Sequence, residues 1–196
     1  MLSWLSNHIA LILEITAVIF GIIYVVLAAK NHISCWIYGI IGSLLSIYLF
    51  VVYAQLYAEA ILYVFYVFAG IYGWITWKKA AHQNEVTTHK ISKHLLIIGI
   101  GIACSLLLYY SINNFFPTAQ RPLTDSFTTV FSFIATYLTA KKWIENWLYW
   151  IVIDAVTVYL YFSRDLSIYA LLMLAYSVIA IFGYLEWKKL KVIKVD

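Results

Sequence analysis

Charged residues are scarce in this chain of 196 residues. They make up 11% of it, against roughly 25% in a soluble domain, while apolar residues make up 64%. A water-soluble monomer could not cover itself with so little polar surface, which excludes a cytosolic globular enzyme and a disordered tail. Cysteine is equally rare, because only Cys35 and Cys104 occur, both inside apolar runs. This excludes a secreted scaffold built on disulfides, and both residues are expected to act as small core residues.

Familiar enzyme motifs are also missing. The chain contains no P-loop, GxSxG, HExxH or CxxC sequence, so an ATP-driven pump would need a partner chain. Five histidines occur, but none stands at a metal-ligand spacing from a carboxylate. We therefore expect no enzymatic activity, no cofactor, no bound metal and no nucleic-acid partner.

Long apolar runs dominate what remains. Seven of them stand between charged or polar breaks, and each is close to the ~20 residues that a helix needs to cross a lipid bilayer. A helix satisfies its own backbone groups in lipid, and the alternating pattern of a membrane strand is absent. The sequence predicts an all-α integral membrane protein with seven transmembrane helices. The predicted spans are residues 9–29, 33–53, 57–77, 94–114, 123–140, 147–163 and 166–187.

Basic residues fall almost entirely on one side of these spans. Arg121 and Arg164 would lie on one side of the membrane and every lysine on the other. Because cytoplasmic loops are rich in lysine and arginine, this places the N-terminus outside and the C-terminus in the cytoplasm. The lysines are Lys30, Lys78, Lys79, Lys90, Lys93, Lys141, Lys142, Lys188, Lys189, Lys191 and Lys194.

The chain also repeats itself. Residues 14–50 match residues 125–161 at an offset of 111, and after a one-residue deletion the offset becomes 110. Equivalent spans are four apart, so they cross the membrane in the same direction, in a parallel 3+1+3 arrangement that is typical of transporters. Matching pairs include Trp36 with Trp147, Gly73 with Gly183 and Trp77-Lys78-Lys79 with Trp187-Lys188-Lys189. The predicted domains are a first repeat (1–80), a basic loop with a linker helix (81–120), a second repeat (121–190) and a cytosolic tail (191–196).

The fifth span is unusually polar for a membrane helix. Thr128, Thr129 and Ser132 share one face with Asp125 at helical spacing, and this face should look into the bundle or a watery cavity. The alternative is that the hydroxyls only pack helices or bond to their own backbone. Asp125 and its repeat mate Glu14 stand near the outer ends of their spans, where they could line a vestibule or gate, or merely cap a helix.

The sixth span has an acid near its middle. An ionisable group at the depth of Asp154 must face a partner or water, which makes it a functional-site candidate. Trp147 and Trp150 step along the same side of the helix, and aromatic faces beside an acid suit a flat cationic ligand. The alternative is a structural, protonated or hydrogen-bonded Asp154.

Two segments resemble the PnuC family of vitamin transporters: residues 35–74, and residues 123–161 with their ENWLYWIVID sequence. The resemblance implies a core like that of the SWEET sugar transporters, a homotrimer in the bacterial inner membrane, and a small-molecule vitamin substrate. It implies passage of nicotinamide riboside without ion or ATP coupling, with intracellular phosphorylation trapping the substrate. It also implies a site built from the hydroxyls of the fifth span and from polar and aromatic residues of the third and sixth. Those residues are Tyr63, Tyr66, Asn146, Trp147, Trp150 and Asp154.

One position departs from the family pattern. Riboside-carrying members often have a glutamine where this chain has Tyr63, and a tyrosine cannot pair with a carboxamide through two hydrogen bonds. Thiamine, another flat cation, therefore stays open beside nicotinamide riboside, as does an ion-coupled transporter that uses Asp154, Glu14 or Asp125 as a proton site. An intramembrane enzyme and a membrane interaction protein are the remaining alternatives.

Overall fold

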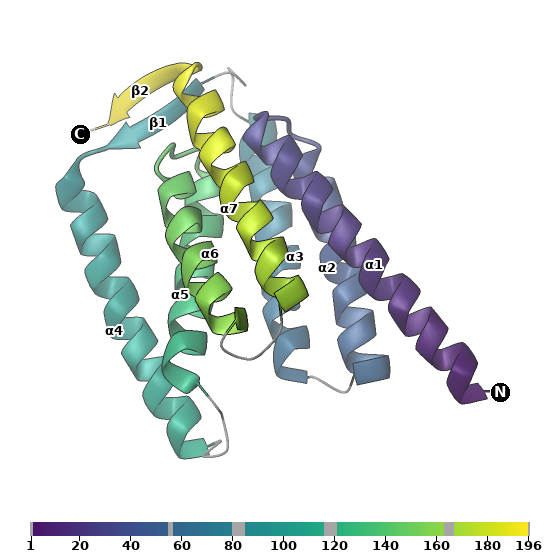
Figure 1. The fold of residues 1–196 in the computed structure, drawn as a ribbon. Helices are drawn as coiled ribbons and strands as arrows, with labels where there is room; N and C mark the ends of the chain where they lie inside the picture. Colours follow the sequence, from purple (N-terminus) through teal and green to yellow (C-terminus); the bar gives the residue numbers. More distant parts are fainter. Residues whose placement is uncertain (1, 55–56, 80–84, 116–120, 163–166, 196) are drawn as a thin grey trace. The chain divides into compact units, whose positions relative to one another are not determined.

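The computed structural model of the chain contains seven α-helices and two short strands among the residues that it describes (Figure 1). Those residues are 2–54, 57–79, 85–115, 121–162 and 167–195. The helices are α1 (Leu2–Ala29), α2 (Cys35–Tyr48), continued by the π-helical segment η1 (Leu49–Ala54), α3 (Tyr57–Lys79), α4 (Ile91–Phe115), α5 (Pro122–Ala140), α6 (Asn146–Phe162) and α7 (Ser167–Lys188). The strands are β1 (Glu85–His89) and β2 (Lys191–Val195).

The chain forms two compact units, residues 1–83 and 84–196. In the first unit, α1 packs on α2, and α2 packs on α3. In the second unit, α4 packs on α5, α5 on α6, and α6 on α7. Gly101 of α4 faces Phe131 and Ile134 of α5, and this close approach brings α4 against the small core that Phe131 forms with Ala135 and Ile153.

Five helices among the described residues are long and apolar enough to cross a membrane: α1, α2 with η1, α3, α4 and α7. α6 is apolar but shorter, with 17 residues. α5 has 19 residues, and its serines and threonines make it less apolar than the other helices. The chain is therefore a multi-span membrane protein, and the crossing of the bilayer by α5 and α6 stays a prediction.

Large apolar side chains cover the outside of both units. Ile61 is 71% exposed, Leu107 68% and Leu171 59%. In water such surfaces would drive aggregation, whereas in a bilayer they face lipid tails. Cys104 also lies on this surface, so it is not the core residue that its apolar run suggested, while Cys35 is buried as expected.

The small parallel sheet corrects the prediction of an entirely α-helical chain. The segments expected as a basic loop and a cytosolic tail contain β1 and β2, which pair from Glu85 opposite Lys191 to His89 opposite Val195. Thr87 of β1 also exchanges backbone hydrogen bonds of 2.9 Å with Lys142 and Ile144, in the turn between α5 and α6. Strand pairing between segments so far apart leaves no local periodicity in the sequence, so the pattern of apolar residues could not reveal it.

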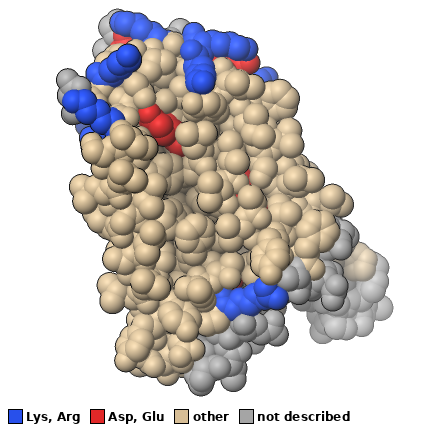
Figure 2. Space-filling model, turned by 60° about the vertical axis from the view of Figure 1, so that its left-hand side comes forward, with Lys and Arg blue, Asp and Glu red and all other residues tan. Residues whose placement is uncertain are grey.

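The same helix ending is built in both units. Two residues beyond the end of α1 and of α5 stands a residue with a left-handed backbone, Asn31 with φ 52° and Lys142 with φ 54°. In each case the next amide reaches back five residues, from His32 to Leu27 and from Trp143 to Leu138, as in a Schellman motif. Figure 2 shows several basic side chains close together on the face that it draws.

The tryptophan–glycine packing is also built twice. Trp36 and Trp77 stand edge to face with ring centroids 5.5 Å apart, and Trp147 and Trp187 do the same at 5.5 Å. All four rings are buried, and a glycine of the neighbouring helix makes room for one ring of each pair. A Cβ atom on Gly73 would lie 2.4 Å from Trp36, and one on Gly183 would lie 2.7 Å from Trp147. These four tryptophans and two glycines occupy matching positions of the sequence repeat.

Substitution of Gly183 by alanine is expected to destabilise the protein by about 1–3 kcal/mol, because the new methyl group overpacks a buried ring that has no room to move. The check is thermal unfolding in detergent. Gly99→Ala is the matched control, because a Cβ at Gly99 meets nothing within 4 Å. It should be neutral or slightly stabilising, since alanine favours a helix more than glycine does. Equal midpoints for the two variants would contradict the packing role of Gly183.

Candidate functional site

The start of α6 is anchored by a group of polar side chains from α5 and α6. Asn146 is fully buried, its amide nitrogen donates to the carbonyl of Trp143 at 2.6 Å, and its amide oxygen accepts from the Thr139 hydroxyl at 2.9 Å. The indole N–H of Trp150 reaches the same hydroxyl at 3.3 Å. Thr139 thus ties the half-buried Trp150 ring to α5. Asn146 was predicted as a substrate-binding residue, but here its side chain is engaged within the protein.

Trp147 lies on a different side of α6 from this anchor. Its side chain is 1% exposed and is packed between Gly183 and Trp187 of α7. Its indole nitrogen is buried without a hydrogen-bond partner among the described residues. The ring is therefore a packing residue in this structure, and its contact with a substrate stays a prediction.

Asp154 stands one turn beyond Trp150 on the same side of α6. It is only 6% exposed. Within the part of the chain that the structure describes, its carboxylate has no hydrogen bond or ion pair, and α6 itself has no basic residue. A buried acid without a protein partner is expensive in a membrane and normally belongs to a functional site.

The hydroxyl face of α5 divides into two groups. The Thr128 hydroxyl donates to the carbonyl oxygens of Thr124 and Asp125, both at 3.1 Å. This agrees with the alternative that hydroxyls of this helix bond to their own backbone. The hydroxyls of Ser126, Thr136 and Thr139 bond back to their own helix in the same way. No such back-bond is found in the described structure for Thr129, which is half-buried, or for the buried Ser132. These two hydroxyls remain the better candidates for contact with a ligand.

In the first unit, Tyr63 and Tyr66 of α3 belong to a chain of aromatic rings. Both are half-buried, with ring centroids 5.7 Å apart, and Phe50 of η1 lies 5.4 Å from Tyr63. The π-helical turn places Phe50 against α3 at this point. Such turns occur often at functional sites, and nothing in the local sequence predicted this one.

Glu14 and Asp125, the predicted vestibule pair, are both half-buried. Asp125 lies in the first turn of α5, where a carboxylate interacts favourably with the helix dipole. Both acids have interaction partners within the protein, so neither is a free charge.

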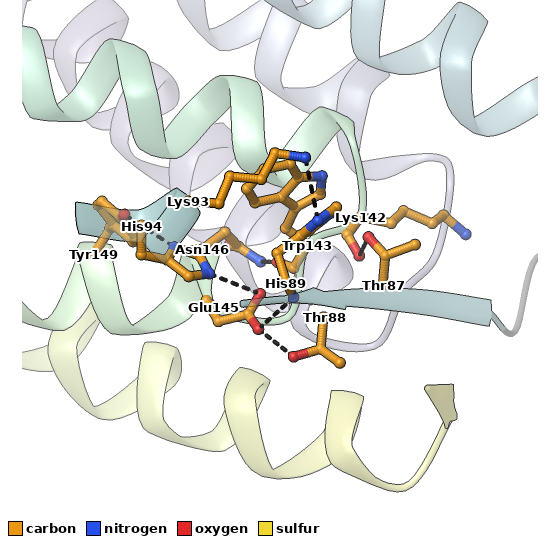
Figure 3. A network of polar contacts seen from close by, with 10 residues as sticks. All are labelled: Thr87, Thr88, His89, Lys93, His94, Lys142, Trp143, Glu145, Asn146 and Tyr149. Carbon is orange, nitrogen blue, oxygen red and sulfur yellow. Dashed lines mark hydrogen bonds and ion pairs between the residues drawn. The ribbon is translucent and has the colours of Figure 1, made fainter. Parts of the chain in front are cut away.

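The sequence interpretation missed a second polar cluster, at the end of the second unit that contains the sheet (Figure 3). Glu145, His94, His89, Lys93 and Tyr149 meet there around the ring of Trp143. Lys93 lies 3.3 Å from the Nδ1 atom of His89, and both residues stack on Trp143. Partial burial lowers the pKa of His89, and the Lys93 ammonium lowers it further, while the Glu145 carboxylate acts in the opposite direction. His89 and His94 are more than 50 residues from Glu145 in sequence, so no local spacing could reveal the cluster.

The sequence and the fold of this chain are both similar to those of known transporters. Residues 11–189 match the nicotinamide mononucleotide transporter family. The nicotinamide riboside transporter PnuC of Escherichia coli K12 is 27% identical, over 95% of this chain and 85% of its own length. PnuC of Neisseria mucosa is 28% identical, over 96% of this chain and 73% of its own. A crystal structure titled as the vitamin B3 transporter PnuC shares the fold, with a TM-score of 0.70 and 24% identity over 90% of this chain and 80% of that one. The chain belongs to the nicotinamide mononucleotide transporter family, which confirms its resemblance to PnuC.

Proposed function

We propose that this protein transports nicotinamide riboside across the bacterial inner membrane. The observation on which the proposal rests is Asp154, an acid that is 6% exposed, has no hydrogen bond or ion pair among the described residues and stands one helical turn from Trp150. Nicotinamide riboside has a flat, positively charged pyridinium ring. Such a ring can offset the buried charge and stack on an indole, an attraction of about 0.5–2 kcal/mol. The relatives in E. coli and N. mucosa are nicotinamide riboside transporters, which supports the same substrate.

The proposed binding residues differ in their roles. Trp150 and Asp154 contact the pyridinium ring, while Thr129 and Ser132 offer hydroxyls to the ribose. Asn146 and Trp147 hold α6 in place through their contacts with Thr139 and with α7, which their burial supports. Asn146, Trp147, Tyr63, Tyr66 and Thr128 remain predicted substrate contacts, and Glu14 and Asp125 remain predicted vestibule residues.

The second candidate substrate is thiamine, and Tyr63 favours it. A tyrosine offers a ring face and one hydroxyl, where a carboxamide would be matched best by two hydrogen bonds from one side chain. The thiazolium of thiamine is also a flat cation, so Asp154 and Trp150 would suit it as well. Purified protein in vesicles should carry nicotinamide riboside, and preferential carriage of thiamine would select the second candidate.

We further propose a parallel 3+1+3 repeat that resembles the SWEET arrangement, with a homotrimer as the assembled form. The twin helix endings and the twin tryptophan–glycine contacts support the repeat, because they recur at the offsets read from the sequence. Transport is proposed to be facilitative and uncoupled, with phosphorylation inside the cell retaining the vitamin.

Cysteine labelling should show Lys78 and Lys189 on the cytoplasmic side and Arg121 on the outside. A parallel repeat with seven spans places the ends of α3 and α7 on the same side, and the excess of lysine makes that side the cytoplasm. Single cysteines would replace these residues in a protein that lacks Cys35 and Cys104, and a membrane-impermeant maleimide would be added to intact cells and to inverted vesicles. Labelling of positions 78 and 189 from opposite sides would contradict the parallel repeat.

A further inference from the structure

His94 faces Glu145, which immediately precedes α6, and Tyr149, which lies one helical turn later in α6. The His94 side chain comes from the first turn of α4 and is buried, with 7% exposed. Its Nδ1 atom lies 3.1 Å from the hydroxyl of Tyr149, and its Nε2 atom lies 3.7 Å from Oε2 of Glu145 (Figure 3). Two contacts at one helical turn of spacing resist both rotation and sliding of a helix, whereas one contact would allow rotation about it.

Glu145 joins the same point to strand β1. Its Oε1 atom accepts hydrogen bonds from the Thr88 hydroxyl and, at 3.2 Å, from the backbone N–H of His89. Its Oε2 atom is directed toward His94 and has no hydrogen bond in the described structure, and the same is true of His94 Nε2. These two buried polar atoms face each other at 3.7 Å, slightly beyond hydrogen-bond distance. A shift of less than about one ångström between α4 and α6 would satisfy both atoms.

We propose that His94 and Glu145 form a clamp through which the linker helix α4 positions α6, and with it Trp150 and Asp154. This inference rests on the proposed function, because it concerns the helix that contains the proposed binding residues. Both residues of the clamp are positioning residues, since neither is proposed to touch the substrate. The inference gives α4, which stands outside the sequence repeat, a role beyond that of a connector.

The surroundings favour a fixed clamp over a solvent-exposed contact. The ring of Trp143 lies edge-on to His94 with centroids 5.7 Å apart, and it also stacks on His89. Lys93, a basic side chain of the same cluster, is engaged with His89 and Trp143. Tyr149 and Trp150, which flank the clamp on α6, both pack against the core formed by Phe131, Ala135 and Ile153. A shift at His94 would therefore reach the Trp150 ring through adjoining contacts.

The test compares His94→Leu with His32→Leu, the same substitution at an exposed histidine of the first unit. Affinity for nicotinamide riboside is measured by titration calorimetry, and hydrogen exchange of residues 146–154 is measured without substrate. His94→Leu should weaken binding about threefold to tenfold, the usual value of one hydrogen-bonded contact, and should speed exchange in α6. Glu145→Gln should do the same, and the double variant should be little worse than either single variant, because both break one clamp. His32→Leu should change neither measurement.

Unchanged affinity and exchange in folded His94→Leu would overturn the clamp, and so would additive losses in the double variant. If His94→Leu does not fold, His94→Gln keeps an amide near the Nε2 position and serves as the test, with an intermediate loss expected and no loss overturning the clamp. A third outcome is that His94→Leu speeds hydrogen exchange in α6 relative to the wild-type protein, while the wild-type protein binds no nicotinamide riboside. That outcome would support the clamp and refute the proposed substrate. The two failures are thus distinguishable.

Discussion

Substitution of Asp154 by asparagine is expected to weaken the binding of nicotinamide riboside about tenfold or more, which corresponds to roughly 1.4 kcal/mol. Asparagine keeps the shape of the side chain and its hydrogen-bonding capacity, but it removes the charge. A charge at this depth costs several kcal/mol unless it is offset, and the described structure offers it no cation. The pyridinium ring would supply that cation, so its affinity should depend on the carboxylate. Titration calorimetry with the purified protein measures the effect.

Two controls separate recognition of charge from a structural role. A neutral analogue of nicotinamide riboside with a reduced ring should lose much less affinity in Asp154→Asn than the cation does. Glu186→Gln, which removes an exposed acid paired with Lys189 at the end of α7, should leave the binding of both ligands unchanged. Equal losses for the cation and the neutral analogue in Asp154→Asn would mean that Asp154 supports the scaffold. No loss for either ligand would shift attention to Thr129 and Ser132.

Nicotinamide riboside should reach equal concentrations on the two sides of a vesicle membrane when the membrane potential is held at zero. Sodium and proton gradients should not raise the internal concentration further. We propose that the Asp154 carboxylate pairs with the substrate cation itself. This acid is therefore not required to carry protons. The potential must be clamped, because a cation responds to voltage by about 2.3 kcal/mol per 100 mV even without coupling.

Retention in the cell then depends on chemistry after entry. A kinase that phosphorylates the riboside adds negative charge and bulk, and the product should no longer pass. Vesicles loaded with such a kinase and ATP should retain label that empty vesicles lose on dilution. Accumulation of unmodified riboside in kinase-free vesicles under a sodium or proton gradient would contradict uncoupled transport.

The helices could be predicted from the sequence, and a repeat could be proposed from it, because both leave local signals. Apolar runs of fixed length indicate spans, and the tryptophans, glycines and paired lysines recur at a constant offset. The structure gives these matches a physical meaning, since Trp147 packs on Gly183 as Trp36 does on Gly73. The burial of Trp147 gives no support to its predicted role in binding. A residue used for packing and a residue used for binding have the same helical spacing in a sequence, so spacing alone could not separate the two roles.

Contacts between distant segments could not be predicted. β1 pairs with β2, and His94 approaches Glu145, because the helices bring separate segments of the chain together. The identity of a residue does not show which distant residue it will contact. The hydroxyls of α5 illustrate an intermediate case. Their shared face was evident from spacing, but only coordinates show that Thr128 bonds to its own helix while no such bond is found for Thr129 among the described residues.

The measurement that tests the central claim most directly is uptake of labelled nicotinamide riboside by vesicles that contain only this protein, with thiamine as competitor. The potential is clamped and no ion gradient is applied. We predict saturable uptake that levels off at equal concentrations, is only weakly inhibited by excess thiamine, and is reduced by Asp154→Asn at low substrate concentration. Absence of protein-dependent uptake, or carriage of thiamine in preference to the riboside, would contradict the proposed function.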